Sequence, residues 1–255
     1  MNAKLVAFHL AREFKFEVGV LAAYLMAALE ELCKLSYHLM MCAHYEAPAV
    51  ENYLNLFNAE PPKGLFRTDI WPGYESAFIR RPREADAGDE AVPAREAVRG
   101  IFGLVPHWSK DLKGAKRTYN ARSETVAEKP SFRDAWRAGQ HCIIPAAAIY
   151  EPDWRSGKAL STRICLADGE PLGIAGLWAY WRSPTGDTIH SFTMLTINAD
   201  HHDLMKNYHR PTDEKRMVVI VPRGAYDDWL NATPGDSMQY MQPYPAERLT
   251  ASAAA

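Results

Sequence analysis

The sequence predicts an α+β fold in which antiparallel β-sheet is the main component. Apolar segments of strand length recur through the second half of the chain, at 142–145, 160–166, 172–181 and 189–197. Turn sequences separate them, namely Arg155-Ser156-Gly157-Lys158, Asp168-Gly169 and Pro184-Thr185-Gly186-Asp187. Helical patterns are short and lie outside this run of strands. Turns at such regular intervals predict an antiparallel meander with several peripheral helices.

Further short elements are predicted on both sides of the meander. Their residue types and spacing predict a helix within 47–58, strands near 76–79 and 98–104, a helix over 132–139, a helical turn near 202–206, a buried strand over 217–221 and a helix over 224–230. The charged, turn-rich segment 82–89 is expected to form a surface hairpin loop. The proline-rich sequence from Thr233 onward predicts a peripheral strand and a frayed end.

The chain is expected to contain an N-terminal extension (1–41), one main domain (42–245) and a frayed tail (246–255). The extension has an apolar run, 18–29, that is too short to span a bilayer and ends in Glu30-Glu31 without a small-residue cleavage site. It is interpreted as a start assigned too far upstream or as a helical extension that is removed. An amphipathic anchoring helix is the remaining alternative.

Composition gives little indication of a partner. The 255 residues are 47% hydrophobic and 24% charged, with a formal net charge of −2, so nucleic-acid binding would depend on a local patch. Four cysteines form no CxxC pair and no metal-ligand spacing, which favours a reducing, cytoplasmic location and no metal cofactor.

The segment Met40-Met41-Cys42 reads like the beginning of a protein. At a chain start, a cysteine has a free α-amine and a thiol on adjacent carbons, and such an aminothiol condenses with an aldehyde to a thiazolidine ring. An internal cysteine lacks this chemistry. The alternative is that Cys42 is a small buried hydrophobic residue, as free cysteines often are.

A basic segment at 106–120 is hidden by the near-neutral total charge. It contains Trp108 and the cations Lys110, Lys113, Lys116 and Arg117, with a single opposing aspartate. These residue types suit a nucleic-acid surface, and the alternative is a solvated lysine-rich loop.

Four polar residues next to apolar strands are candidates for chemistry or for binding. Glu151 ends a buried run and could exchange protons, or it could be a solvated residue at a strand end. His209 precedes a buried strand and could act as acid or base, or could have a structural hydrogen-bonding role. Asn120 and Arg122 share one side of an extended segment and suit a phosphate or sugar. The alternative is a turn asparagine and a surface ion pair of Arg122 with Glu124.

The sequence has no GxxxxGK[ST], HExxH, GxSxG or GxGxxG motif. In this order, its motifs instead resemble the SOS response-associated peptidase (SRAP) family, whose members shield abasic sites in single-stranded DNA by cross-linking to them. The matching motifs are Met41-Cys42, Gly103-Leu104-Val105-Pro106-His107-Trp108, Asn120-Ala121-Arg122-Ser123-Glu124-Thr125, Tyr150-Glu151, His209-Arg210-Pro211 and Arg216-Met217.

The resemblance implies a barrel-like fold and a covalent thiazolidine cross-link between Cys42 and the ring-opened abasic aldehyde. Glu151 and His209 would move protons, and Asn120 would orient the sugar or the cysteine. The implied DNA contacts are a base-stacking wedge and phosphate or electrostatic contacts, supplied by Trp108, Asn120, Arg122, Arg216, Lys116, Lys110 and Lys113. The implied partner is abasic single-stranded DNA, bound by a monomer in the cytoplasm or nucleoid, with no cofactor and no membrane.

The sequence departs from the family pattern in three places. Family members commonly begin Cys-Gly-Arg, whereas Cys42 is followed by Ala43-His44, and His44 would replace the arginine weakly. Glu151 is followed by Pro152-Asp153 before the tryptophan, and the segment 211–215 separates His209-Arg210 from Arg216.

Two other functions stay open at this point. Cys42, Glu151 and His209 could form a thiol peptidase that removes residues 1–41, with possible lyase-like activity. Alternatively, Trp108, Arg122 and the lysines could bind single strands without chemistry. A zinc site from Cys42, His44 and Cys142 has irregular spacing and is disfavoured.

Overall fold

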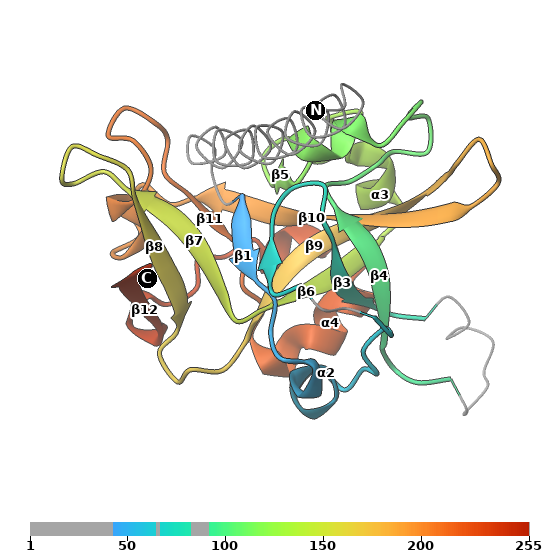
Figure 1. Ribbon diagram of the computed structural model, residues 1–255, viewed down its shortest axis with the longest axis horizontal. Coiled ribbons are helices and arrows are strands. Elements are labelled where there is room, and N and C mark those ends of the chain that lie inside the picture. The colour runs from blue at the N-terminus through green and yellow to red at the C-terminus, as the bar shows by residue number, and fades with distance from the viewer. Residues whose placement is uncertain (1–42, 65–66, 83–91, 255) are drawn as a thin grey trace, which may run out of the picture. The chain divides into compact units, whose positions relative to one another are not determined.

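The computed structural model describes residues 43–64, 67–82 and 92–254, which belong to one compact unit, Met41–Ala255. The predictions for the extension 1–41, for Cys42 and for most of the 82–89 loop therefore lie outside the described residues. Within the described part, two sheets dominate, one of seven strands and one of five (Figure 1). The predicted α+β class with mainly antiparallel sheet is confirmed.

The strands follow the chain in the order β1 (His44–Glu46), β2 (Asp69–Ile70), β3 (Glu75–Arg80), β4 (Glu96–Phe102), β5 (Asn120–Arg122), β6 (His141–Ala146), β7 (Ala148–Asp153), β8 (Leu160–Leu166), β9 (Leu172–Arg182), β10 (Thr188–Asn198), β11 (Arg216–Val218) and β12 (Leu249–Ala253). The α-helices are α2 (Val50–Phe57), α3 (Arg133–Arg137) and α4 (Tyr226–Asn231). The 3-10 helices are η2 (Lys113–Arg117), η3 (Met205–Asn207), η4 (Arg223–Ala225), η5 (Ser237–Tyr240) and η6 (Ala246–Arg248).

The larger sheet closes on itself into a barrel. Strand β10 pairs with β9 on one side and, in parallel, with β4, and the circuit continues through β3 and β6 back to β9. Closure removes exposed strand edges, which otherwise invite pairing with other chains. Beyond the circuit, β10 also pairs in parallel with β5 and antiparallel with β11. Strand β10 is thus the element on which the later chain segments converge.

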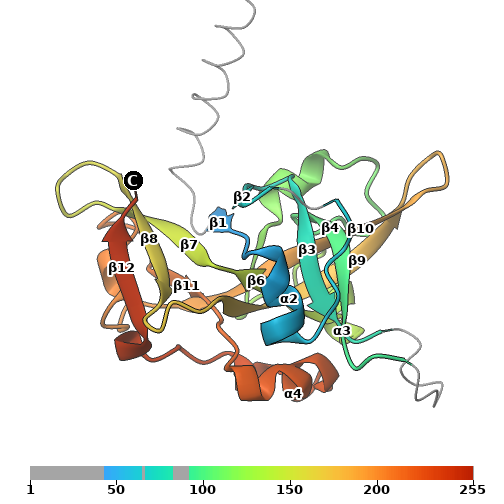
Figure 2. The same ribbon diagram turned by 60° about the horizontal axis from the view of Figure 1, so that its bottom comes forward.

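The smaller sheet has the order β12-β8-β7-β1-β2. Figures 1 and 2 both show β7, β8 and β12 to one side of the barrel strands β3 and β4. The chain passes from the barrel to this sheet at Ala147, between β6 and β7, where the Ala147 amide donates to the Glu46 carbonyl at 2.7 Å. That crossing places β7 beside β1.

The predicted meander is therefore wrong in one respect. Strand β6 pairs with β9, and the hairpin of β7 and β8 between them belongs to the other sheet. Burial gives the reason. Strand β6 is buried throughout and β9 through most of its length, whereas β8 alternates between buried and less buried residues. Strands buried on both faces occupy the interior, and an alternating strand suits an outer sheet with one wetter face.

Aromatic side chains fill the barrel where its strands approach one another. Phe192 of β10 lies 5.6 Å from Phe102 of β4 and 5.5 Å from Phe78 of β3, measured between ring centroids, and all three rings are fully buried. Outside the barrel, α2 and α4 lie side by side in both ribbon views, with the rings of Phe57 and Tyr226 stacked at 5.5 Å. The core depends on contacts between strands that are distant in sequence.

The peripheral strand expected in the tail is confirmed as β12, and it runs through Ala253, so most of the segment 246–255 that was expected to fray is ordered. Residues Leu249–Ala253 pair antiparallel with β8, from Leu249 opposite Leu166 to Ala253 opposite Thr162. Backbone hydrogen bonds to an open strand edge need no large side chain, so the small residues of this tail can pair. The other predicted elements occur with bounds shifted by a few residues, which is the usual uncertainty at element ends.

Candidate functional site

A buried acid and a buried histidine meet at the end of β7. The side chain of Glu151 on β7 is fully buried, and its Oε2 lies 3.4 Å from Nδ1 of His209, whose side chain is 2% exposed. The backbone explains the meeting. The segment before His209 forms a bridge from Tyr208 to Asp153, and the His209 amide donates to the Pro152 carbonyl at 3.0 Å. The expected solvated alternative for Glu151 is therefore wrong.

A hydrogen bond of the His209 ring shows which of its nitrogens donates. Its Nε2 lies 3.0 Å from the carbonyl oxygen of Arg216, and a carbonyl oxygen only accepts, so Nε2 carries a proton and donates it. The other ring nitrogen, Nδ1, faces the Glu151 carboxyl group. The Glu151 Oε2 atom lies 3.4 Å from it, and both side chains are buried. The pair can exchange a proton with a bound group while staying out of water.

The backbone of His209 adopts a conformation that side chains other than glycine rarely take. Its φ is 66°, in the left-handed region, which costs roughly 1–2 kcal/mol for a residue with a Cβ. Residues in such conformations cluster at functional sites when the surrounding structure holds them in place. Here two hydrogen bonds hold His209 in place, one from its backbone amide to the Pro152 carbonyl and one from its ring to the Arg216 carbonyl.

Strand β1 leads the chain to this pair. Its register on β7 sets His44 opposite Tyr150 and Tyr45 opposite Ile149. Extended by one residue, the register sets the buried Ala43 opposite Glu151. Ala43 is the residue that follows Cys42 in the sequence, and Cys42 itself lies outside the described residues. Ala43 thus lies at the same end of the sheet as the acid–base pair.

The ring of His44 is held between two aromatic side chains. It stacks on Trp71 at 4.2 Å and on Tyr150 at 4.1 Å, with interplanar angles of 10° and 11°. Its Nε2 contacts the Asp69 carboxylate, which also accepts a hydrogen bond from Trp71 Nε1 at 3.0 Å. This arrangement engages His44 with protein groups, so the geometry does not support the expected replacement of a phosphate-binding arginine.

Asn120 and Arg122 lie on β5, beside β10. The parallel register sets Asn120 opposite Met194 and Arg122 opposite Thr196. The Arg122 guanidinium is half-exposed and makes its ion pair with Glu214 at 2.9 Å. The ion pair expected with Glu124 is therefore replaced by one with a residue from a distant loop. An exposed guanidinium on a short strand can still reach a phosphate.

Arg216 is placed differently from the sequence-based expectation. Its side chain is 1% exposed, and its guanidinium donates two bonds to Glu124, at 2.8 and 2.9 Å, and one to Glu214 at 2.9 Å. It also donates to the Thr196 carbonyl at 2.8 Å. A buried, multiply bonded guanidinium is a poor phosphate ligand. In this arrangement Arg216 holds β5, β10 and β11 together, and its carbonyl orients His209.

These residues form an alternating chain of charges, Arg122–Glu214–Arg216–Glu124. Burial alone would raise the pKa of Glu124, but the hydrogen bond and charge of Arg216 hold that pKa below its ordinary value. Burial alone would lower the pKa of Arg216. The carboxylates of Glu124 and Glu214 outweigh this effect and raise that pKa above its ordinary value. Sequence reasoning named Glu124 within a motif but missed Glu214. A signal was present, because Glu214 precedes Arg216 by two residues, but a pairing between distant loops cannot be read from spacing.

The predicted DNA-contact residues of the 106–120 segment lie at the surface. Trp108 is 53% exposed, and Lys110, Lys113 and Lys116 are exposed. The segment turns back on the barrel at Gly103, whose φ is 120° and whose amide donates to the Phe192 carbonyl at 2.8 Å. An exposed tryptophan beside several cations is a surface suited to stacked bases and phosphates.

Among the residues that the structure describes, no group of three or more His, Cys, Asp or Glu side chains is arranged to hold a metal ion. No helix within the described ranges is long and apolar enough to cross a membrane.

A closed barrel, with a buried glutamate–histidine pair at β7 next to β1, defines the class of the protein. The sequence model of the SOS response associated peptidase (SRAP) family matches residues 41–254, and the chain belongs to this family. The resemblance suggested by the motifs is thereby confirmed.

Several relatives carry names that describe a role. The abasic site processing protein YoqW of Bacillus subtilis is 36% identical over 154 residues, which are 59% of this chain and 65% of YoqW. The abasic site processing protein HMCES of Rattus norvegicus is 26% identical over 149 residues, or 46% of this chain and 40% of HMCES. The matched region thus spans just under two thirds of YoqW and less than half of HMCES.

Solved structures agree with the family assignment. A crystal structure of a Bordetella bronchiseptica protein is 50% identical and matches with a TM-score of 0.76, covering 84% of this chain and 100% of that one. A Bacteroides thetaiotaomicron protein that is 19% identical has the same fold, with a TM-score of 0.66 over 83% of this chain and 91% of that one.

Proposed function

We propose that the protein recognises abasic sites in single-stranded DNA and forms a thiazolidine cross-link to them through Cys42, once the Cys42 α-amine is free. One observation carries the proposal. A buried acid–base pair, Glu151 and His209, lies where the strand register sets Ala43, the residue after Cys42. The names of the relatives YoqW and HMCES support the same substrate.

The proposed reaction is a condensation. The neutral Cys42 α-amine attacks the aldehyde carbon of the ring-opened abasic sugar, a C–N bond forms, and the aldehyde oxygen leaves as water to give an imine. The thiolate sulfur then attacks the imine carbon, a C–S bond forms, and the nitrogen takes up the proton that the thiol released. An α-amine with a pKa of about 7.7–8 is already roughly one-tenth neutral at pH 7.

The acid–base pair has a defined part in this sequence. Proton delivery is needed when the sugar ring opens and when water leaves, and Glu151 and His209, 3.4 Å apart, are the groups that would supply it in both steps. A positioned acid–base group typically contributes about 10²–10⁴-fold to such a rate. Asn120 would orient the sugar, Arg122 would contact a phosphate, and Trp108 would stack on a base.

The test uses protein that begins at Cys42, which corresponds to the family match over 41–254. We expect an abasic single-stranded oligonucleotide to give a band shift that survives heat and SDS, and an intact oligonucleotide to give none. Cys42→Ala should give no shift. A shift of equal strength from Cys42→Ala would refute the proposed chemistry.

Glu151→Gln tests the acid–base role. The amide keeps the size of the side chain and can donate a hydrogen bond to His209 Nδ1, but it cannot release the proton. We expect the cross-linking rate to fall about 10²–10⁴-fold with little loss of DNA affinity. Glu128→Gln, at an exposed position, is the matched control. Equal rates in the two variants would contradict the role of Glu151.

The same materials examine the two other functions. A thiol peptidase that acts on the extension would release residues 1–41 from the full chain, and intact mass would detect the release and its loss in Glu151→Gln. A binding module without chemistry would give only a reversible complex that weakens steeply with salt.

A further inference from the structure

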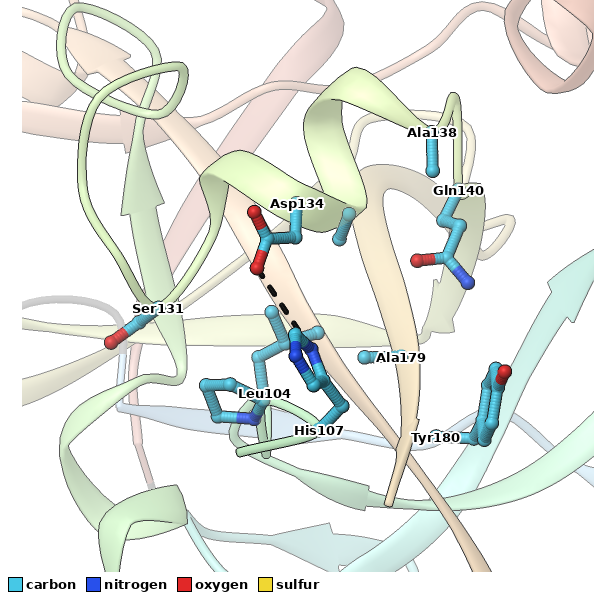
Figure 3. Close-up of a pocket in the computed structure, with 10 residues that line it drawn as sticks. Leu104, His107, Ser131, Asp134, Ala138, Gln140, Ala179 and Tyr180 are labelled. Atoms are coloured by element: carbon cyan, nitrogen blue, oxygen red, sulfur yellow. Dashed lines mark ion pairs between the residues drawn. The ribbon is translucent and has the colours of Figure 1, made fainter. Parts of the chain in front are cut away.

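A cavity that the proposed chemistry does not use lies between α3 and the end of β9. We call it the α3 pocket, and its volume is about 290 Å³. Its floor is apolar and buried, formed by Leu104, Ala135 and Ala179. Its rim is polar, and Figure 3 shows His107 and Asp134 pointing toward each other. An apolar floor with a few placed polar groups is typical of a ligand site, and the volume is near the lower end of the usual range of about 300–1,000 Å³.

The strand register locates the pocket relative to the predicted DNA contacts. Ala179 of the pocket floor lies opposite Ser191 on β10, Asn120 lies opposite Met194, and Arg122 follows opposite Thr196. Three residues along a strand correspond to about 10 Å. The pocket and Asn120 thus flank the same strand a short distance apart. A DNA strand bound at Asn120 needs to extend little to reach the pocket.

The polar rim selects the chemistry of the ligand. The Asp134 carboxylate lies 3.9 Å from His107 Nδ1 and 3.6 Å from Arg133 Nε, distances longer than hydrogen bonds, so its lone pairs can accept from a ligand. A carboxylate repels a phosphate. On the same rim, the Gln140 amide offers both a donor and an acceptor. These groups suit a neutral ligand with an N–H donor and an apolar face.

A nucleobase has both properties, and the surroundings bring one within reach. His107 of the rim is followed directly by the exposed Trp108, and then by Lys110 and Lys113. Cations and a stacking surface outside the pocket can hold the DNA backbone and a neighbouring base while one base enters.

We propose that the α3 pocket binds one nucleobase next to the abasic site and favours a base with an exocyclic amine (adenine, cytosine or guanine) over thymine. The amine donates to Asp134, and Gln140 bonds to the same base edge. This inference deepens the proposed function and depends on it, because it needs DNA as the partner. The abasic site itself has no base to recognise, so the pocket gives the protein its sequence preference at the neighbouring nucleotide.

Equilibrium binding separates the pocket from the chemistry. The full chain with Cys42→Ala would be titrated by fluorescence anisotropy against abasic single-stranded oligonucleotides that differ in one base, adjacent to the lesion on either side. We expect the amine-bearing bases to bind about tenfold more tightly than thymine on one side of the lesion. Adding Asp134→Asn should reduce this ratio to near one, and Gln140→Ala should reduce it in part. Asp228→Asn, the same charge change at an exposed position of α4, should leave the ratio unchanged.

Three outcomes of the binding experiment would overturn the inference. Equal affinity for all four bases on both sides overturns the inference, and so does the absence of DNA binding. A higher affinity of Asp134→Asn for every oligonucleotide, with the base ratio unchanged, also overturns it, because it would show only the loss of a negative charge. Cross-linking by protein that begins at Cys42, measured in parallel, tests the proposed reaction. If cross-linking fails while the affinities for the amine-bearing bases and for thymine still differ, the proposed chemistry is overturned and the pocket remains supported.

Discussion

Lowering the pH from 7 to 4 should destabilise the protein through one buried histidine, His141. This residue begins β6, is 2% exposed and packs its ring on Trp229 at 4.1 Å. Ser237 donates its hydroxyl proton to the Thr233 carbonyl at 2.9 Å, so its oxygen accepts from His141 Nε2, also at 2.9 Å. Among the described residues, His141 Nδ1 has no hydrogen-bond partner. Protonation would place a positive charge on a ring that is almost fully buried.

The magnitude follows from the pKa. Burial lowers the pKa of His141 to about 4, against a smaller raising effect of the Trp229 backbone. The unfolded chain, with an ordinary pKa of about 6.5, binds more protons than the folded chain between these values, so stability falls as the pH falls. One pKa unit corresponds to about 1.36 kcal/mol, and the free energy of unfolding should therefore decrease by about 3 kcal/mol from pH 7 to pH 4.

Urea unfolding of the full chain, followed by tryptophan fluorescence at several pH values, measures this change. Carboxylates also titrate near pH 4, so the informative quantity is the difference between the wild type and His141→Gln. The variant should lack the histidine contribution and lose about 3 kcal/mol less over this range. Replacing the exposed His201 by Gln provides the matched control for removing one imidazole. The same pH dependence in His141→Gln and in the wild type would refute the reasoning.

Three further variants test the proposed DNA contacts and the turn at Gly103. Arg122→Ala should weaken binding to single-stranded DNA and reduce the slope of log affinity against log salt by about 0.7, whereas Arg216→Met should leave the slope unchanged and lower the free energy of unfolding by about 2 kcal/mol. A reduced slope in Arg216→Met would show that its guanidinium does reach a phosphate. Gly103→Ala should lower the free energy of unfolding by about 2–5 kcal/mol, because its Cβ would lie 1.9 Å from the Ala115 carbonyl oxygen at a φ of 120°. Thermal melting checks this, with Gly114→Ala, where a Cβ meets nothing within 4 Å, as the control.

Local patterns predicted most of the secondary structure. The apolar runs at 172–181 and 189–197 became β9 and β10, and the amphipathic pattern at 47–58 contained α2. Each of these predictions depends on the chemistry of neighbouring residues, and neighbours in the sequence are also neighbours in space. Pairing was harder to predict. The parallel contact of β10 with β4 joins residues about ninety positions apart, and nothing in either strand indicates its partner.

The candidate site likewise has features that the sequence predicted and features that only the structure shows. The sequence by itself nominated Cys42, Glu151 and His209, because their residue types and motif order carry a chemical signal. Only the tertiary structure decided that Glu151 and His209 meet, that Arg216 is buried between two carboxylates and that Arg122 pairs with Glu214. Burial and ion pairing are set by segments that approach one another when the barrel closes, so spacing along the chain cannot give them. Residue chemistry named the candidates, and the packing of distant strands assigned each its protons and partners.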